Sequence, residues 1–166
     1  MRTATISALI FAALSVASAM AGDLRYPQTG TPAFSMRVPD GWTFKTDDNG
    51  AMVIEAPDRS AEVVLSFAAF SGTLDQRAAN VIKGTAAGEA PRGINTKFAG
   101  HDAEVFQTGM FTDTGAHTSI RLYLMRLDPD HVASVSVVVA DDITDAQKAP
   151  LRALLGSAAL AAASGH

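Results

Sequence analysis

The sequence FSMRVPDGW, residues 34–42, decides the fold class of this 166-residue chain. Phe34, Met36 and Val38 alternate with polar residues, which is the period-two pattern of a strand that buries one face. The Pro-Asp-Gly that follows predicts a turn, because proline and glycine favour the backbone angles that turns require. Alternation then resumes at Trp42 and Phe44. The stretch therefore predicts short consecutive strands joined by turns.

The strand pattern continues beyond this stretch. Asn49-Gly50 ends a DDNG tetrad and is a strong hairpin signal, because both residues tolerate positive φ angles. Residues 52–55 are expected to run back antiparallel, and a second turn is expected at 57–60. Residues 62–70 are rich in valine, leucine and phenylalanine, which predicts a central strand. We therefore expect a meander of about four strands over residues 34–70.

A helix is predicted where the period changes. Thr73 to Gln76 has the form of a capping box, and apolar or small residues then recur on one helical stripe. The stripe consists of Leu74, Ala78, Val81, Ile82 and Thr85. Residues 88–93 contain two glycines and Pro91 and are expected to form a loop.

A second group of strands follows this loop. They are expected at residues 94–98, 103–112 and 118–127, with a hairpin at 113–116. Residues 132–140 are β-branched and nearly uncharged, as in a strand at the middle of a sheet.

The C-terminal part predicts a second helix. Thr144 to Gln147 again has the capping-box form, and leucines follow at helical spacing. Pro150 would remove a backbone donor inside a helix, so we expect a short turn and then a helix from about Pro150. Residues 158–163 favour helix by their alanine content, and residues 161–166 are expected to be a frayed tail.

These elements predict an α+β fold: an antiparallel sheet of about six to seven strands with helices packed on it, an α/β/α sandwich. Residues 34–160 are expected to form a single domain, because this length supports one core. The residues 34–42 quoted above resemble the start of the PsbP-like superfamily, which includes DcrB-like periplasmic proteins. Ala99-Gly100-His101-Asp102-Ala103 is similar to a turn of that superfamily, and residues 155–160 resemble its closing helix. The resemblance implies an α/β/α sandwich that serves as a binding or assembly-assisting module, with no catalytic residues to carry over.

The N-terminus has the pattern of a signal peptide over residues 1–21. Arg2 gives a positive start, residues 6–16 are mostly apolar, and small residues lead to a cleavage site after Ala21. A membrane anchor is the alternative, but the apolar run is shorter than the roughly 20 residues that a spanning helix needs. We therefore expect a periplasmic or secreted protein with no membrane span after cleavage. Residues 22–33 carry two prolines and a glycine after Leu24 and are expected to be an extended lead-in.

The sequence predicts no catalytic, cofactor or metal-binding residues. The chain has no cysteine, which excludes thiol catalysis and disulfides, and it has neither a dinucleotide-binding motif nor a P-loop. His101, His117, His131 and His166 do not follow the spacing of zinc ligands. The serines lie outside nucleophile motifs; they are Ser60, Ser66, Ser71, Ser119, Ser134 and Ser136.

Other residues have both a structural and a functional interpretation. Trp42 is expected to be a core residue rather than a stacking surface for a ligand. The methionines at 36, 52, 110 and 125 are expected to fill the core rather than bind copper, because they lack Met-x-x-Met spacing. Arg121 and Arg126, beside Tyr123, mark either an anion-binding or protein-binding face or an ordinary solvated strand face.

These observations favour a non-enzymatic module with an unidentified protein partner in the cell envelope. The net charge of −4 and the scattered basic residues argue against nucleic acid as a partner. The alternative is a small-molecule, lipid or metal-binding protein, and a hydrolase is the least expected class.

Overall fold

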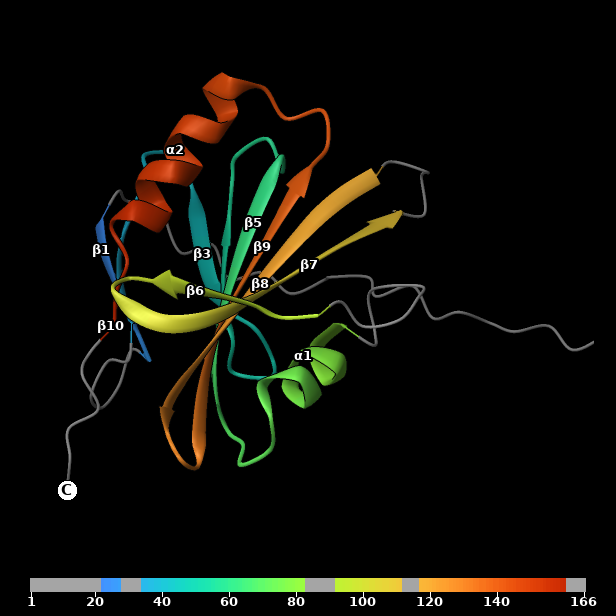
Figure 1. The fold of residues 1–166 in the computed structure, drawn as a ribbon. Helices are drawn as coiled ribbons and strands as arrows, with labels where there is room; N and C mark the ends of the chain where they lie inside the picture. Colours follow the sequence, from blue (N-terminus) through green and yellow to red (C-terminus); the bar gives the residue numbers. More distant parts are fainter. Residues whose placement is uncertain (1–21, 28–33, 83–91, 112–116, 161–166) are drawn as a thin grey trace, which may run out of the picture.

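The computed structural model describes residues 22–27, 34–82, 92–111 and 117–160. Within them, seven antiparallel strands form a large sheet in the order β3-β4-β5-β9-β8-β7-β6 (Figure 1). Their bounds are β3 Thr43–Thr46, β4 Met52–Glu55, β5 Ala61–Ala69, β6 Ile94–Phe98, β7 His101–Phe111, β8 His117–Asp128 and β9 His131–Ala140. The predicted α+β class with an antiparallel sheet of six to seven strands is confirmed. The expected signal peptide (1–21), hairpin (113–116) and tail (161–166) lie outside the described residues.

Three further strands form a small sheet in the order β1-β2-β10. They are β1 Gly22–Tyr26, β2 Phe34–Val38 and β10 Ala159–Leu160. Two expectations are corrected here. The first part of the lead-in is a strand of the domain, because Leu24 and Tyr26 alternate with polar residues and are buried. The strand at 34–38 pairs with β1 and β10 and takes no part in the predicted meander.

The β3–β4, β4–β5, β6–β7 and β8–β9 pairs form as the turns between them predict. Asp47 accepts hydrogen bonds from the backbone amides of Asn49 and Ala51 through Oδ1, at 2.9 and 2.8 Å. Gly50 adopts a φ of 81°, a left-handed conformation that glycine takes up without strain. This turn joins β3 to β4 as a hairpin. As predicted, β9 lies at the middle of the large sheet, between β5 and β8.

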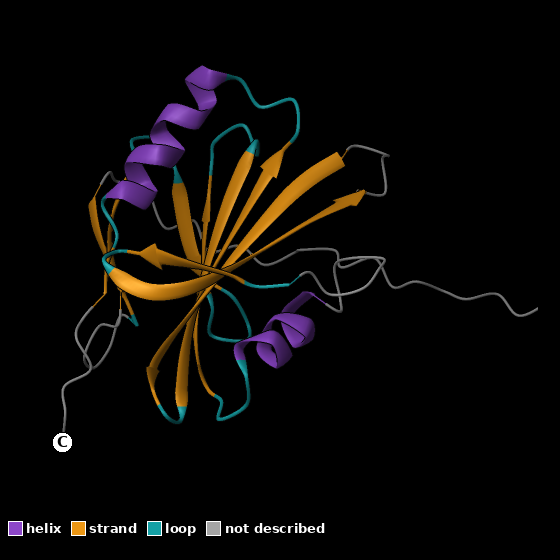
Figure 2. Cartoon of the chain, in the orientation of Figure 1, coloured by secondary structure: helices purple, strands orange, loops and turns teal. Residues whose placement is uncertain are grey.

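The two helices lie on opposite faces of the large sheet (Figure 2). Helix α1, Leu74–Ile82, contributes Ala78 and Ile82 to a cluster with Leu122, Leu124 and Val132. Helix α2, Asp145–Gly156, contributes Leu151 and Leu154 to a larger cluster that includes Met125, Ala133 and Val135. Successive residues of β8 and β9 thus point to different helices, as a strand requires. The small sheet adds Leu24, Phe34, Met36 and Leu160 to the larger cluster.

The start and end of α2 differ from the expectation. The helix begins at Asp145, five residues before the expected start, and Pro150 lies inside it. The capping box of Thr144 and Gln147 fixes this start, and it outweighs the backbone donor missing at Pro150. The helix ends at Gly156, so the expected helical conformation of residues 158–160 is wrong. Ala159–Leu160 extends instead because it pairs with Ser35 and Phe34 of β2.

Neither helix in the described ranges has the length and apolar character needed to cross a bilayer.

Candidate functional site

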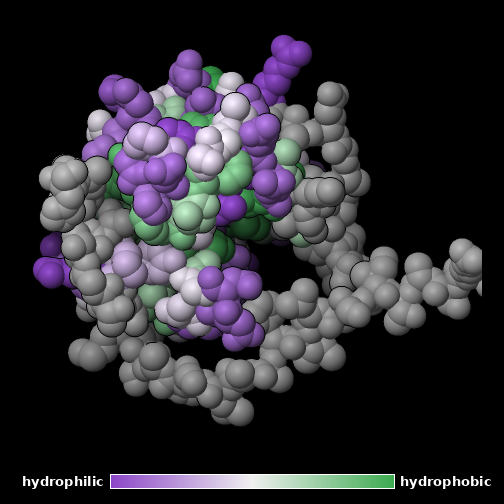
Figure 3. Space-filling model, turned by 90° about the horizontal axis from the view of Figure 1, so that it is seen from below, coloured by the Kyte–Doolittle hydropathy of each residue, from purple (hydrophilic) through white to green (hydrophobic). Residues whose placement is uncertain are grey.

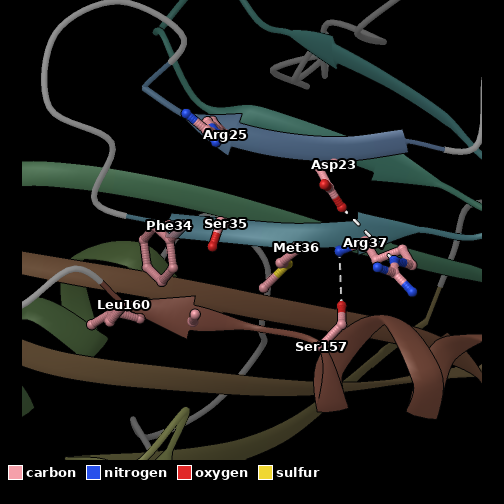
Figure 4. Close-up of a pocket in the computed structure, with 9 residues that line it drawn as sticks. Asp23, Arg25, Phe34, Ser35, Met36, Arg37, Ser157 and Leu160 are labelled. Atoms are coloured by element: carbon pink, nitrogen blue, oxygen red, sulfur yellow. Dashed lines mark hydrogen bonds and ion pairs between the residues drawn. The ribbon is translucent and has the colours of Figure 1, made fainter.

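A polar surface covers the outer side of the small sheet, and we call it the small-sheet surface. Its outward side chains are Asp23 and Arg25 on β1 and Ser35 and Arg37 on β2. Leu24 and Tyr26 of β1 and Phe34, Met36 and Val38 of β2 are buried on the opposite side. Two adjoining cavities of about 480 and 680 Å³ lie here and share Arg37 and Ser157. Figure 4 shows the first, between β1, β2, β10 and the end of α2.

The strand register brings the charged groups together. Asp23 lies opposite Arg37, and Arg25 lies opposite Ser35. The Arg37 and Asp23 side chains form a long ion pair of 3.8 Å, and they are 80% and 76% exposed. An exposed pair of this length contributes little to stability. Arg25 and Arg37 are both exposed, so both guanidinium groups are accessible to a partner.

The end of α2 forms the far wall of the first cavity. β10 pairs with only two residues of β2, so Arg37 lies beyond it. Its backbone amide donates to Ser157 Oγ at 2.8 Å, and Ser157 in turn donates to the Leu154 carbonyl at 2.7 Å. One serine thus joins the end of the helix to the small sheet. Apolar Phe34, Met36 and Leu160 also line the cavity.

A second concave region, which we call the α2 groove, lies between α2 and the large sheet. Its volume is about 450 Å³. Arg121 and Tyr123 of β8 line it, as the sequence suggested for a possible binding face. Arg126 is not part of it. Its guanidinium group donates to the carbonyls of Phe70 and Pro129, each at 3.0 Å, and to that of Gly72.

The described histidines lie apart from one another along the chain, and His131 is held by neighbouring side chains. His131 Nδ1 lies 2.9 Å from both carboxylate oxygens of Asp128, and its ring stacks on Phe67 with centroids 5.2 Å apart. Asp102, which follows His101, pairs with Lys97 at 2.8 Å. His166 lies outside the described residues. No group of three or more histidine, aspartate or glutamate side chains in the described ranges is arranged to hold a metal ion.

A Ser–Asp–His cluster stands at one end of the α2 groove. Asp141 accepts a hydrogen bond from Ser119 Oγ through Oδ1 at 2.7 Å and contacts His117 Nδ1 through Oδ2. The hydrogen bonds from Ser119 and then His117 lower the pKa of Asp141. Because the hydroxyl proton of Ser119 goes to a carboxylate, this serine does not donate to an imidazole as a triad nucleophile does.

Other serines also have structural partners. The hydroxyl groups of Ser66 and Ser134 bond to each other across β5 and β9, and Ser60 donates to Asp58 at 2.6 Å. Trp42 is only 3% exposed and belongs to the larger core cluster, as predicted. Met36, Met52 and Met125 are buried there too, while Met110 is half-buried.

The underside of the molecule is mixed in character. Figure 3 shows green apolar side chains toward the middle of this view, bordered by purple hydrophilic ones. Two large apolar residues in the described ranges are exposed, Phe67 at 41% and Ile94 at 61%. The exposed ring of Phe67 stacks on the ring of His131, which covers one of its faces.

Arg121 and Tyr123 are recognisable as candidates in the sequence, but the residues of the small-sheet surface are not. Arg25 is in the expected lead-in, and Ser157 is in the expected C-terminal helix. The alternation of Leu24 and Tyr26 with polar residues was the available signal, and Pro27 obscured it.

The arrangement of sheets and helices is the PsbP-like fold, as comparisons with solved structures show. CyanoP, the cyanobacterial PsbP of Synechocystis sp. PCC 6803, has a TM-score of 0.57 and 11% identity, over 90% of this chain and 98% of that one. LpqN of Mycobacterium tuberculosis, described as involved in cell envelope biogenesis, has a TM-score of 0.57 and 14% identity, over 84% and 89%. The Ran-binding protein Mog1p of Saccharomyces cerevisiae has a TM-score of 0.50 and 13% identity, over 86% and 96%.

A Bacteroides thetaiotaomicron structure is also similar, with a TM-score of 0.53 and 14% identity over 78% of this chain, which spans 45% of that longer chain. No model of a known protein family matches the sequence, and no curated protein sequence matches it. At these identities the likeness concerns the fold.

Proposed function

We propose that this protein is an exported, non-enzymatic binding or assembly-assisting module that engages a protein partner in the cell envelope through its small-sheet surface. The observation that carries the proposal is the pair of adjoining cavities beside Arg25 and Arg37. Among the residues the structure describes, the Arg25 side chain has no hydrogen bond or ion pair, and that of Arg37 has only its long contact to Asp23. Arginine is enriched at protein interfaces, where its planar group forms several directed hydrogen bonds.

The edge of the small sheet offers a second mode of contact. β1 pairs with β2 on one side, and no strand in the described ranges pairs with its other side. Unpaired backbone groups along such an edge can accept an extended segment of a partner as an added strand. The arginines of the small-sheet surface would then contact acidic groups of the same partner.

The similar structures support a binding role by analogy. Mog1p is a Ran-binding protein, and LpqN is involved in cell envelope biogenesis. The Ser119 hydroxyl group, which donates to Asp141, also favours binding over hydrolysis.

Export rests on the signal-peptide pattern of residues 1–21. Cleavage after Ala21 would leave Gly22 as the first residue, and Gly22 is also the first residue of β1, opposite Val38. The mature chain would therefore begin where the small sheet begins, and would consist of one domain that ends near residue 160.

The test is capture of a partner from native cell envelopes by the mature chain, with cross-linking and mass spectrometry. Arg25→Ala and Arg37→Ala should each weaken capture of a stoichiometric protein, by roughly tenfold or more if they are central contacts. Arg92→Ala is the matched control, because Arg92 is exposed, has no side-chain partner in the described ranges and lies outside this surface. Equal capture by all variants, or no protein captured by any, would contradict the proposal.

A further inference from the structure

The α2 groove combines an apolar floor with a cationic rim. Side chains of β8, β9, the loop after β9 and α2 line it, and every one belongs to the described residues. Its volume of about 450 Å³ lies within the range of roughly 300–1,000 Å³ typical of small-molecule sites. The lining residues are Ser119, Arg121, Tyr123, Val137, Val139, Ala140, Asp141, Ile143, Lys148, Leu151, Arg152 and Leu155.

The floor continues the hydrophobic core to the surface. Val137, Ile143 and Leu151 are buried, at 3%, 8% and 6% exposure. Tyr123 and Leu155 pack against the same core cluster but remain partly exposed. An apolar chain lying on these two residues would remove their surface from water, which favours binding.

The rim holds cations from two different elements. Arg121 extends from β8, and Arg152 from α2. Both are exposed, and neither guanidinium group has a hydrogen bond or ion pair to any residue of the described ranges. Lys148, also on α2, has only a weak partner, Asp145, at 3.5 Å. Two unpaired guanidinium groups on either side of one groove form a complementary site for an anion.

The acidic residue of the groove is placed at one end. Asp141 is bound by Ser119, and Ser119 precedes Arg121 and Tyr123 on the same face of β8. A bound anion is therefore repelled from the Asp141 end and attracted toward Arg121, with Tyr123 further along the strand. The two ends of the groove thus differ: the acidic Asp141 lies at one end, Arg121 lies next along β8, and the apolar surface at Tyr123 follows.

We propose that the α2 groove binds a single-chain anionic amphiphile. Its carboxylate or phosphate head lies between Arg121 and Arg152, and its alkyl chain covers Tyr123 and Leu155. This goes beyond the proposed protein-binding function, because it uses a different surface and different residues.

The first test measures binding of dodecanoate and dodecyl phosphate to the mature protein by titration calorimetry, below their critical micelle concentrations. Comparing these two probes distinguishes a carboxylate head from a phosphate head. Inorganic phosphate supplies the charge without the chain, and dodecyltrimethylammonium supplies the chain with the opposite charge. We expect at least one anionic amphiphile to bind, and both single-feature probes to bind at least tenfold more weakly.

The second test uses variants of the rim. Arg121→Gln and Arg152→Gln should each weaken binding of the anionic amphiphile about tenfold, the effect of one charge-assisted hydrogen bond. Arg92→Gln, which removes an exposed charge elsewhere, should leave binding unchanged. All three side chains are exposed, so circular dichroism should show an unchanged fold.

Three results would overturn the inference. They are the absence of binding by both anionic amphiphiles, equal binding of either single-feature probe, and equal affinity of the wild type and the two rim variants. Shorter chains give a further check: each methylene group that leaves the groove should weaken binding about three- to fourfold. Affinity that does not depend on chain length would contradict a role for Tyr123 and Leu155.

Discussion

Asp58 is a single exposed carboxylate that joins a turn to a helix. It accepts hydrogen bonds from Ser60 Oγ at 2.6 Å and the Ser60 amide at 3.0 Å, and from Gln147 Nε2 of α2 at 2.7 Å. These bonds, that of the Ser60 hydroxyl first, lower the pKa of Asp58 from 3.8 to about 2. The stability that these hydrogen bonds provide is fully present above pH 3.8, the ordinary pKa of the carboxyl group. It is lost as the pH falls toward 2, the pKa in the folded protein.

We therefore expect Asp58→Asn to lower the unfolding free energy at neutral pH. The variant should also lose less stability than the wild type between pH 4 and pH 2, since it has no carboxylate to protonate. Urea unfolding across this range measures both effects. Asp48→Asn is the control, because that exposed side chain has no hydrogen bond in the described ranges. An identical pH dependence of Asp58→Asn and the wild type would refute the expectation.

The pKa of Glu62 is shifted in the opposite direction to that of Asp58. Burial, and then the nearby Glu55, raise the pKa of the Glu62 carboxyl group above its ordinary 4.5. The folded protein binds this proton more tightly, so stability falls as the pH rises through the raised value. Glu62→Gln should stabilise the protein at pH 7, by less than about 1 kcal/mol because the group is only partly buried. The gain should vanish near pH 4, where the wild-type side chain is itself neutral, and a gain that persists there would point to another cause.

At this scale, the sequence predicts burial better than polar contacts. Trp42 and Met36 are recognisable as core residues because their neighbours alternate in polarity. The bond between Asp58 and Gln147 joins residues 89 positions apart, and no local pattern indicates it. Arg121 was identified as a candidate, but its lack of a partner depends on which side chains the fold places around it.

Helix α2 depends on its first turn. Thr144 Oγ1 accepts from the Gln147 amide at 3.3 Å, and Gln147 Oε1 accepts from the Thr144 amide at 2.8 Å. Thr144→Ala should cost about 1 kcal/mol of stability, because it removes the acceptor for an end-of-helix amide. Thr144→Ser retains the hydroxyl group and should cost much less. Chemical denaturation of the three proteins checks this, and equal losses for alanine and serine would show that the methyl group matters instead.

Elements were predictable where local signals decide them. The hairpin at Asn49-Gly50 and the capping box at Thr144 act over a few residues, and both were identified. β10 was missed because it is extended by pairing with β2, which is distant in sequence, and β1 was missed because Pro27 obscured its short alternation. The start of α2 was misplaced because Pro150 was given more weight than the cap that precedes it.

The molecule as a whole depends on β1. Leu24 and Tyr26 are 3% and 7% exposed and belong to the larger core cluster. A chain that begins at Phe34 should therefore be less stable than one that begins at Gly22, by about 3 kcal/mol or more, from the loss of two buried side chains. Urea unfolding of the two chains measures the difference. Equal midpoints would show that β1 contributes nothing to the fold.

The overall class was within reach of the sequence, because alternating strands, two amphipathic helices and a single core leave few architectures. The split into two sheets was not. It depends on whether β2 pairs with β3 or with β1, and the alternating pattern of β2 does not indicate which strand it joins.

The pairing of β10 with β2 also sets the order in which the protein can be assembled. β2 begins at Phe34, but its partner Leu160 comes more than a hundred residues later. A chain threaded from its N-terminus through a ribosome or a translocation pore cannot complete the small sheet until Leu160 has emerged. Until then β2 lacks the backbone pairing and the packing that Ala159 and Leu160 provide, so the small sheet is completed only after the large sheet has been synthesised.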